Sequence, residues 1–402
     1  MPSASVPLHK STRVGAKTRT RSSIDLLAEL MERKAMLESA PASDVPRHIV
    51  HLIKHCGYAN GNVHVAVDLA CVQSRAGHRV TFISDGGTFL PLLEQCGVQH
   101  INLNHDQGKP LSVLRTMWTV ACFARRHKPY VMNAHMMSSA LVGWVASLVS
   151  GVPLVTVVHN SFDKHSSIMR LGRRVIAVSL AERDSLLRKG YRSDRLVAVM
   201  NAPANSPREA FMDDHREIVL SSPAIVAINA LHRRKGVFDL IEACTRLFTD
   251  LSEWKLYIAG EGPDSATLKK QVELAGLSDR IIFLGFVPAP ARLLKQADIV
   301  VLASYADPCS LVIGEARAAG CAIVATDVGG TKEMLEYGRA GRLVPPGRPD
   351  ALASVMRPLM EDDQERLALR RASLRGADVF NVERLVQDYA TIYQQAQGGL
   401  SV

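Results

Sequence analysis

Residues 298–330 read DIVVLASYADPCSLVIGEARAAGCAIVATDVGG, and this stretch decides the fold. The apolar run 299–303 is typical of a short buried strand, and a second such run follows at 322–326. Between them the apolar spacing becomes helical from Leu311 onward and stops at Gly320, the residue type that most often ends a helix. A strand, a helix and a second strand in this order predict one right-handed βαβ unit of a parallel sheet.

Polar residues lie where the first strand of this unit meets its loop. Ligands of parallel sheets bind beyond the carboxyl ends of the strands, and this end carries Asp307 and Ser310. We expect Ser310 to cap the helix, so that the free N–H groups of Leu311 and Val312 face the ligand. Glu315 follows one turn along the same helix. This arrangement suits a phosphate and sugar hydroxyl groups, although acids in such loops are also common as caps or solvated groups.

The composition indicates a globular protein with two domains. A chain of 402 residues exceeds the usual size of one domain, and 47% apolar residues supply two cores. The seven cysteines are scattered singly, which favours a reducing compartment such as the cytoplasm. The net charge of +9 indicates an attraction to anions, which include nucleotides, nucleic acids and anionic lipids. Aromatic residues make up only 5% and no motif that reads RNA or DNA is present, which argues against nucleic acid.

The N-terminal segment, residues 1–46, differs in composition from the rest. Residues 1–22 carry many Ser, Lys and Arg and no acid, as a disordered basic tail does. Residues 24–37 follow an amphipathic helical pattern, which we expect to dock on the first domain, with self-association or a membrane surface as alternatives. The uncharged stretch 140–158 is interrupted by Gly and Pro, and we expect a helix and a buried strand there rather than a membrane span.

The segment 47–202 alternates strand and helix patterns, which predicts a first Rossmann-like domain. Its first loop, 56–62, is rich in Gly and Asn and can adopt positive φ. Gly61 there either lets the backbone approach a substrate or lies in a simple turn. His135 and His159 each follow a strand, on the side where ligands bind, but a histidine in such a place is more often held by backbone hydrogen bonds.

A polar linker, 203–220, leads to a second domain at 221–380 and a last helical segment at 381–402. The loop after the first strand of this domain carries three consecutive cations and a glycine: Arg233, Arg234, Lys235 and Gly236. Cations at the carboxyl end of a strand suit a diphosphate. A solvated basic loop is an equally common explanation of the same residues.

The spacing of Asp307 and Glu315, with the following VATDVGGTKEML, resembles the Glu-x7-Glu region of retaining glycosyltransferases of family 4. The first Glu is Asp307 here, and the family's Phe-Gly is Cys309-Ser310. The resemblance covers about residues 47–397 and is looser in the N-terminal half. It implies an α/β protein of the GT-B fold, with two Rossmann-like, doubly wound domains facing across a cleft and a last helix that crosses back to the first domain.

The resemblance also implies which residues bind the donor's nucleotide. Lys235-Gly236 matches the family's phosphate-binding Lys-Gly, and Arg234 or its neighbour would replace the family's Arg, whose position is Ala230. Ser310 and Leu311 at the helix start would share the phosphates, and Glu315 would accept hydrogen bonds from the ribose. Val287, just past a Phe-x-Gly pattern, would meet the nucleobase.

The transferred sugar is expected to contact catalytic residues from both domains. The resemblance implies that Asp307 holds the hydroxyl groups of this sugar and that His159 contacts the sugar from the first domain. It also implies that Gly61 belongs to the loop that lets the backbone approach the sugar. No Asp-x-Asp motif stands in a donor-binding position, since Asp213-Asp214 lies in the linker. We therefore expect neither a metal ion nor another cofactor.

The resemblance implies a retaining glycosyltransferase that uses a nucleotide-diphosphate sugar and a glycan or lipid-linked acceptor in cell-surface polysaccharide or glycolipid synthesis. We expect it in the cytoplasm, at the inner face of the membrane if the helical segment 111–128 provides a peripheral contact, and core packing is the alternative role of that segment. An epimerase of the same fold and a non-enzymatic basic binding protein are the other functions considered. The Lys235 and Asp307–Glu315 pattern argues against the epimerase, and the few aromatic residues and the lack of a motif that reads RNA or DNA argue against a nucleic-acid-binding protein.

Overall fold

The computed structural model describes residues 45–58, 60–103, 110–162, 164–212 and 218–398. All of them fall in one compact unit, Ala42–Val402. The expected basic tail and the amphipathic pattern at 24–37 lie outside the described residues.

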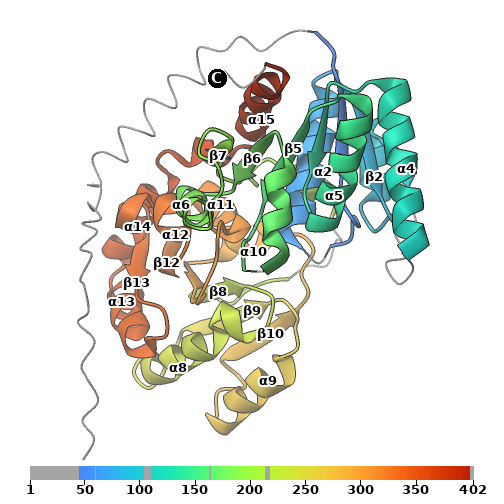
Figure 1. Cartoon of the computed structure of the whole chain (residues 1–402). Coiled ribbons are helices and arrows are strands. Elements are labelled where there is room, and N and C mark those ends of the chain that lie inside the picture. The colour runs from blue at the N-terminus through green and yellow to red at the C-terminus, as the bar shows by residue number, and fades with distance from the viewer. Residues whose placement is uncertain (1–44, 59, 104–109, 163, 213–217, 399–402) are drawn as a thin grey trace, which may run out of the picture. The chain divides into compact units, whose positions relative to one another are not determined.

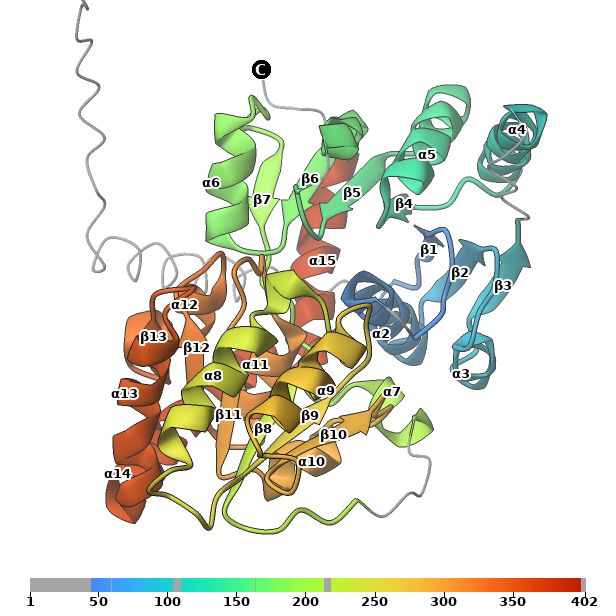
Figure 2. The same ribbon diagram turned by 90° about the horizontal axis from the view of Figure 1, so that it is seen from below.

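The first sheet has seven parallel strands in the order β3-β2-β1-β4-β5-β6-β7 (Figure 1; each strand is labelled in Figure 2). Strand order reverses between β1 and β4, which makes that gap the topological switch point of the sheet. The strands are β1 (His48–Leu52), β2 (Arg79–Ser84), β3 (Gln99–Asn102), β4 (Val131–Ala134), β5 (Leu154–Val158), β6 (Arg174–Ala177) and β7 (Leu196–Ala198). The helices are α2 (Gly61–Arg75), α3 (Leu90–Gln95), α4 (Pro110–His127), α5 (Met137–Ser150), η1 (Lys164–Leu171), α6 (Leu180–Arg188) and α7 (Pro207–Phe211).

The second sheet has six parallel strands in the order β10-β9-β8-β11-β12-β13, so its switch point lies between β8 and β11. The strands are β8 (Ala224–Ile228), β9 (Lys255–Ala259), β10 (Ile281–Gly285), β11 (Ile299–Leu302), β12 (Ala322–Thr326) and β13 (Arg342–Val344). The helices are η2 (Arg233–Lys235), α8 (Val237–Leu247), α9 (Ser265–Leu274), α10 (Ala291–Gln296), α11 (Leu311–Ala318), α12 (Thr331–Met334), η3 (Glu336–Gly338), α13 (Pro349–Glu361), α14 (Asp363–Leu374), η4 (Ala377–Phe380) and α15 (Val382–Gln397).

The βαβ unit predicted from residues 298–330 is confirmed as β11, α11 and β12, with the two strands paired in parallel. Gly320 has φ +68°, the left-handed conformation that ends a helix without strain only for glycine. The uncharged stretch also divides as predicted, into α5 and β5. Among the described residues no helix is both long and apolar enough to cross a membrane.

The prediction of positive φ in the loop 56–62 is wrong for the residues that the structure describes there. Asn60 has φ −138°, and neither Gly57 nor Gly61 has a positive φ. Gly61 instead begins α2, because the chain enters the helix directly from the extended Asn60. This loop therefore uses the small size of Gly61 rather than its conformational freedom.

Helix α15 packs against the first sheet although it follows the second in sequence. It contacts α2, β5 and β6, and Figure 2 shows it running alongside the first sheet. Asn133 Nδ2 in β4 donates a 2.8 Å hydrogen bond to the hydroxyl of Tyr393 in this helix. One hydrophobic core cluster contains residues of β5, α11 and α15 together, so burial joins the C-terminal helix to both sheets.

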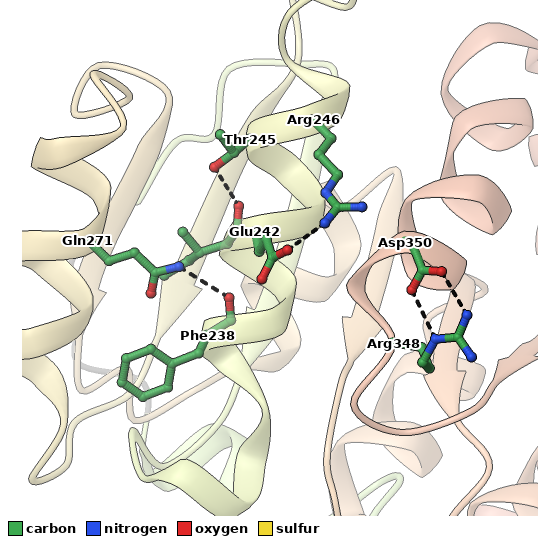
Figure 3. A network of polar contacts seen from close by, with 8 residues as sticks. Phe238, Glu242, Thr245, Arg246, Gln271, Arg348 and Asp350 are labelled. Atoms are coloured by element: carbon green, nitrogen blue, oxygen red, sulfur yellow. Dashed lines mark hydrogen bonds and ion pairs between the residues drawn. The ribbon is translucent and has the colours of Figure 1, made fainter.

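Helix α8 packs its apolar residues into the core of the second sheet, and Figure 3 shows polar contacts that its residues make. Arg246 and Glu242 form an exposed ion pair one turn apart on this helix. Gln271 of α9 donates to the carbonyl of Phe238 and links the two helices. Arg348 and Asp350 form a similar exposed pair before and within the first turn of α13.

Candidate active site

Lys235 and Asp307 face each other at the switch point of the second sheet. Lys235 ends the short helix that follows β8, and Asp307 lies in the loop that follows β11, the neighbouring strand. The Nζ atom of Lys235 is 2.7 Å from Oδ2 of Asp307, and both side chains are largely shielded from solvent. The Lys235 ammonium group has three N–H donors, so pairing with Asp307 leaves donors for a further anion.

Gly236 holds the Lys235 loop against the end of β11. It has φ +65°, and a Cβ atom at this position would lie 1.8 Å from the carbonyl oxygen of Ala303. No other residue type fits so close an approach of two backbones. The neighbouring Tyr305 N–H donates a 2.8 Å hydrogen bond to the carbonyl of Arg234, which ties the two loops together. The Lys235-Gly236 pair thus fixes the backbone position from which the Lys235 side chain extends.

Gly329 fixes the Asp307 loop from the other side. Its φ is +51°, and a Cβ atom there would lie 2.0 Å from the carbonyl oxygen of Asp307. The N–H of Gly330 donates to the carbonyls of Asp307 and Pro308. The Gly329-Gly330 pair after β12 therefore packs against the backbone of Asp307 and fixes the position of its carboxylate.

Ser310 occupies the N-cap position of α11, but its side chain makes no capping hydrogen bond. The prediction that Ser310 is the N-cap residue is confirmed, but the predicted capping hydrogen bond is wrong. Ser310 is buried, and its side chain accepts no hydrogen bond from the first amides of the helix. Leu311 then contacts Gly61 of α2, where a Cβ atom would lie 3.3 Å from Leu311 Cδ1. The structure thus brings two predicted site residues together from different sheets.

Glu315 is half-buried on α11, close to charged groups of α2 and α7. Loss of hydration raises the pKa of its carboxyl group to about 7, and Glu209 and Asp68 add to the rise, whereas Arg208 opposes it. Among the described residues none donates a hydrogen bond to the Glu315 side chain. A carboxylate without a protein donor can accept hydrogen bonds from a ligand's hydroxyl groups.

His159 lies directly after β5 and contacts another histidine. Its Nε2 is 3.3 Å from Nδ1 of His135, and the two rings are stacked with centroids 5.6 Å apart. Burial lowers the pKa of His159 to about 3, so its ring is neutral at physiological pH. His135, which the sequence left without an assignment, is thus part of the surroundings of His159.

Arg234 extends toward the first sheet. Its guanidinium group lies 4.9 Å from the ring centroid of Phe162, which follows β5. The described contacts therefore join Lys235 to Asp307 and Gly61 to Leu311, whereas Arg234 stacks on Phe162 and His159 contacts His135.

A cavity of about 330 Å³ opens at the carboxyl ends of β9 and β10. It is lined by Leu231, Gly260, Glu261, Gly262, Ser265, Lys269, Phe283 and Gly285. Val287, the residue predicted to meet a nucleobase, is half-buried two residues after Gly285, and Phe286 between them stacks on Tyr58 of the first domain. Phe283 and Lys269, which line this cavity, and Tyr58 were not predicted from the sequence. The Gly-x-Gly-Pro pattern at 260–263, after β9, was the available signal for the cavity.

No cluster of three or more His, Cys, Asp or Glu side chains with a metal-binding arrangement occurs in the part of the chain that the structure describes.

Two family models match the chain, one for each sheet. Residues 59–202 match the model described as Glycosyltransferase Family 4, and residues 211–375 match the model described as Glycosyl transferases group 1. Among curated relatives, N-acetyl-alpha-D-glucosaminyl L-malate synthase of Bacillus anthracis is 30% identical over 43% of this chain, and the match spans 45% of that relative's length. Alpha-D-kanosaminyltransferase of Streptomyces kanamyceticus is 28% identical over 64% of this chain and 74% of its own length.

Solved structures agree with these matches in fold. The Anabaena protein HepE, solved with UDP and glucose, has a TM-score of 0.72 at 22% identity and covers 86% of this chain and 98% of its own. A glycosyltransferase of Rickettsia africae has a TM-score of 0.75 at 19% identity, over 88% and 99% of the two chains. The first domain therefore matches Glycosyltransferase Family 4 and the second matches the glycosyl transferases of group 1, and the chain is a glycosyltransferase with the two α/β domains of the GT-B fold.

Proposed function

We propose that this protein is a retaining, metal-independent glycosyltransferase that takes its sugar from a nucleotide-diphosphate donor. The observation that carries the proposal is the Lys235–Asp307 pair at the switch point between β8 and β11, beside the start of α11. Ligands of doubly wound sheets bind at this point. The structural neighbour HepE was solved with UDP-glucose, which is the class of donor that such a site would accept.

The diphosphate is proposed to bind between Lys235 and the first amides of α11. Breaking the anomeric C–O bond leaves negative charge on the phosphate oxygens, while the sugar becomes oxocarbenium-like. Lys235 supplies N–H donors and positive charge, and the helix start from Ser310 adds backbone amides and the positive end of the helix dipole. Arg234 lies next to Lys235 and adds a second cation once the donor is bound.

The two carboxylates are proposed to bind different sugars of the donor. Glu315 accepts hydrogen bonds from the ribose, and Asp307 holds hydroxyl groups of the transferred sugar while it orients Lys235. Asp307 reaches less far than a Glu by one methylene, roughly 1.5 Å of bond length. This difference affects which sugar hydroxyl is bound more than whether transfer occurs.

The nucleobase is proposed to enter the cavity at the ends of β9 and β10, with Val287 beside it. Its glycine-rich lining lets a planar ring approach the backbone, and Phe283 offers an apolar wall. His159 is proposed to contact the transferred sugar from the first domain.

Transfer is proposed to proceed on one face of the donor sugar. The acceptor oxygen bonds to the anomeric carbon, the bond to the β-phosphate breaks with its electron pair going to the phosphate, and the acceptor proton passes to a phosphate oxygen. Lys235 and the start of α11 stabilise the charge that this step creates, so the proposal needs no metal ion or other cofactor.

The acceptor is proposed to be a glycan or a lipid-linked glycan of the cell surface. One curated relative, from Campylobacter jejuni, is named as a transferase that acts on a diphospho-undecaprenol glycan. Helix α4 exposes Leu114 and Trp118, with Arg115 between them and Arg125 and Arg126 in its last turn. Such a combination suits a peripheral contact with an anionic membrane from the cytoplasmic side.

A thermal-shift screen with UDP, GDP, ADP and their common glucose, mannose and N-acetylglucosamine conjugates tests the donor class. A ligand that binds only the folded state raises the melting temperature. Turnover of the best donor is then followed with and without EDTA, and the anomeric configuration of the product is read by NMR. We expect activity in EDTA and a retained configuration; an inverted product, or activity lost in EDTA and restored by Mg²⁺, would contradict the proposed mechanism.

A further inference from the structure

Three histidine rings form a row at the switch point of the first sheet. His51 is in β1, His135 follows the neighbouring β4, and His159 follows β5. His51 Nδ1 is 3.1 Å from His135 Nε2, and His135 Nδ1 is 3.3 Å from His159 Nε2. Both pairs of rings are stacked at 25°, with centroids 5.4 and 5.6 Å apart. The row is thus connected through ring nitrogens at each step.

At the buried end of this row, Gln73 of α2 determines which ring nitrogen of each histidine donates a hydrogen bond. Its Oε1 atom, which can only accept, lies 2.8 Å from His51 Nε2, so that nitrogen carries the hydrogen. The Tyr393 hydroxyl, which accepts from Asn133 Nδ2, lies beside the Gln73 side chain. The Gln73 amide nitrogen can donate toward that oxygen when the Gln73 carbonyl oxygen faces His51.

Each neutral imidazole ring carries one N–H hydrogen, so the direction of donation in one hydrogen bond fixes the direction in the next. His51 has its hydrogen on Nε2, and its Nδ1 must accept from His135 Nε2. His135 Nδ1 is then also without a hydrogen and must accept from His159 Nε2. Burial lowers the pKa of all three rings, which keeps each of them neutral and the row uninterrupted.

We propose that His51 and His135 are positioning residues that hold His159 in the tautomer with hydrogen on Nε2, leaving its Nδ1 unprotonated as a hydrogen-bond acceptor. This inference rests on the proposed function where it assigns His159 to the transferred sugar. A fixed acceptor at Nδ1 selects a hydroxyl group as the partner, because a hydroxyl can donate to it. The Gln73 amide, two rings away, therefore determines which kind of group His159 can bind.

The tautomer of His159 is measured on the full chain with 15N-labelled histidine. Ring-nitrogen NMR near neutral pH distinguishes protonated from unprotonated nitrogens, and H159Q identifies the signals of His159. We expect a protonated Nε2 and an unprotonated Nδ1 in the wild type. A protonated Nδ1, or a mixture of the two tautomers, would overturn the proposal.

Three variants test whether the row causes this preference. H135F keeps an aromatic ring but cannot accept from His159, and the two nitrogens of His159 should then share the hydrogen. H135N keeps an acceptor near the former Nδ1 and should restore the wild-type pattern. H48F is the matched control, because His48 is in the same strand as His51 but bonds Thr81 outside the row; its His159 signals should not change. If H135F does not fold, H51F breaks the row one ring earlier and is read in the same way.

Turnover separates this inference from the proposed function. With the fastest donor of the nucleotide-sugar panel, kcat should fall about 10- to 100-fold in H135F, recover in H135N and stay unchanged in H48F. A His159 tautomer that shifts in H135F without a change in kcat would overturn the positioning role. If H159Q itself leaves kcat unchanged, the assignment of His159 in the proposed function fails, while the NMR result still decides whether the row fixes its tautomer.

Discussion

The carboxylate of Glu333 in α12 binds the backbone N–H groups of Leu180 and Ala181, at distances of 2.8 and 2.6 Å. These amides begin α6, a helix of the first domain, whereas α12 belongs to the second. A helix start leaves its first N–H groups without partners inside the helix, and a carboxylate there also complements the helix dipole. Glu333 therefore links the two domains through a helix terminus.

Replacing this carboxylate should destabilise the protein. In E333A two shielded N–H groups lose their acceptors, and we expect a loss of about 1 to 3 kcal/mol in the free energy of unfolding. Urea denaturation followed by circular dichroism measures it. E273A, which truncates an exposed glutamate on α9, is the control and should change stability by less than about 0.5 kcal/mol. Equal midpoints for E333A and E273A would show that the cap contributes nothing.

Asp68 of α2 and Arg208 of α7 form a buried, two-pronged ion pair, with N–O distances of 2.8 Å on both prongs. R208M leaves the Asp68 carboxylate buried and unpaired and should cost about 3 to 5 kcal/mol. The double variant D68L/R208M removes both charges and should be clearly more stable than R208M alone. Urea midpoints of the two single variants and the double variant measure the coupling. If the losses in unfolding free energy of D68L and R208M simply add up in the double variant, the two charges do not stabilise each other.

The raised pKa of Glu315 predicts a stability that depends on pH. Because its pKa rises from 4.5 to about 7 on folding, the folded protein holds a proton between these values that the unfolded chain has released. This group therefore lowers stability as the pH rises through that window. E315Q does not titrate, so its stability relative to the wild type should increase by roughly 1 to 3 kcal/mol between about pH 5 and about pH 8. A difference in melting temperature that is the same at both pH values would argue against the raised pKa.

The histidine row predicts sensitivity to acid. Burial lowers the pKa of His51 to about 4, so the unfolded chain binds a proton below about pH 6.5 that the folded chain rejects. The stability that His51 supplies is complete above that pH and is lost as the pH falls toward 4. In H51F the slope of unfolding free energy against pH, measured with urea between about pH 5 and 6, should decrease by about 1.4 kcal/mol per pH unit. An unchanged slope would mean that His51 is protonated in the folded protein.

The fold and much of the site could be predicted because they depend on local patterns. Strand and helix periodicities in residues 298–330 gave β11, α11 and β12 nearly to the residue. Lys235 and Asp307 were both expected at the carboxyl ends of strands, since each lies in the loop that follows an apolar run. The sequence spacing does not show that β8 and β11 are neighbours, and this adjacency is what pairs the two side chains.

Contacts that depend on strand order or on remote segments were not predictable in the same way. The row from Gln73 to His159 needs β1 beside β4, and the Glu333 cap needs two domains in contact. The short helices α3 and η1 also escaped the analysis, because few residues carry too little periodicity to be distinguished from loops. The N-cap position of Ser310 could be predicted from the sequence, but the side-chain rotamer, which makes no capping hydrogen bond, could not.

The central claim is that Lys235 and the start of α11 bind the diphosphate of the donor. Isothermal titration of the full chain with the nucleoside diphosphate that gives the largest thermal shift tests it directly, with K332A as the control. Lys332 is a half-exposed lysine of the same domain, and its ammonium group pairs with Asp327 rather than with Asp307. We predict that K235A weakens binding about 10- to 100-fold, the value of a charged hydrogen bond of about 1.5 to 3 kcal/mol, and that K332A binds as the wild type does. Equal affinities of K235A and the wild type would contradict the account.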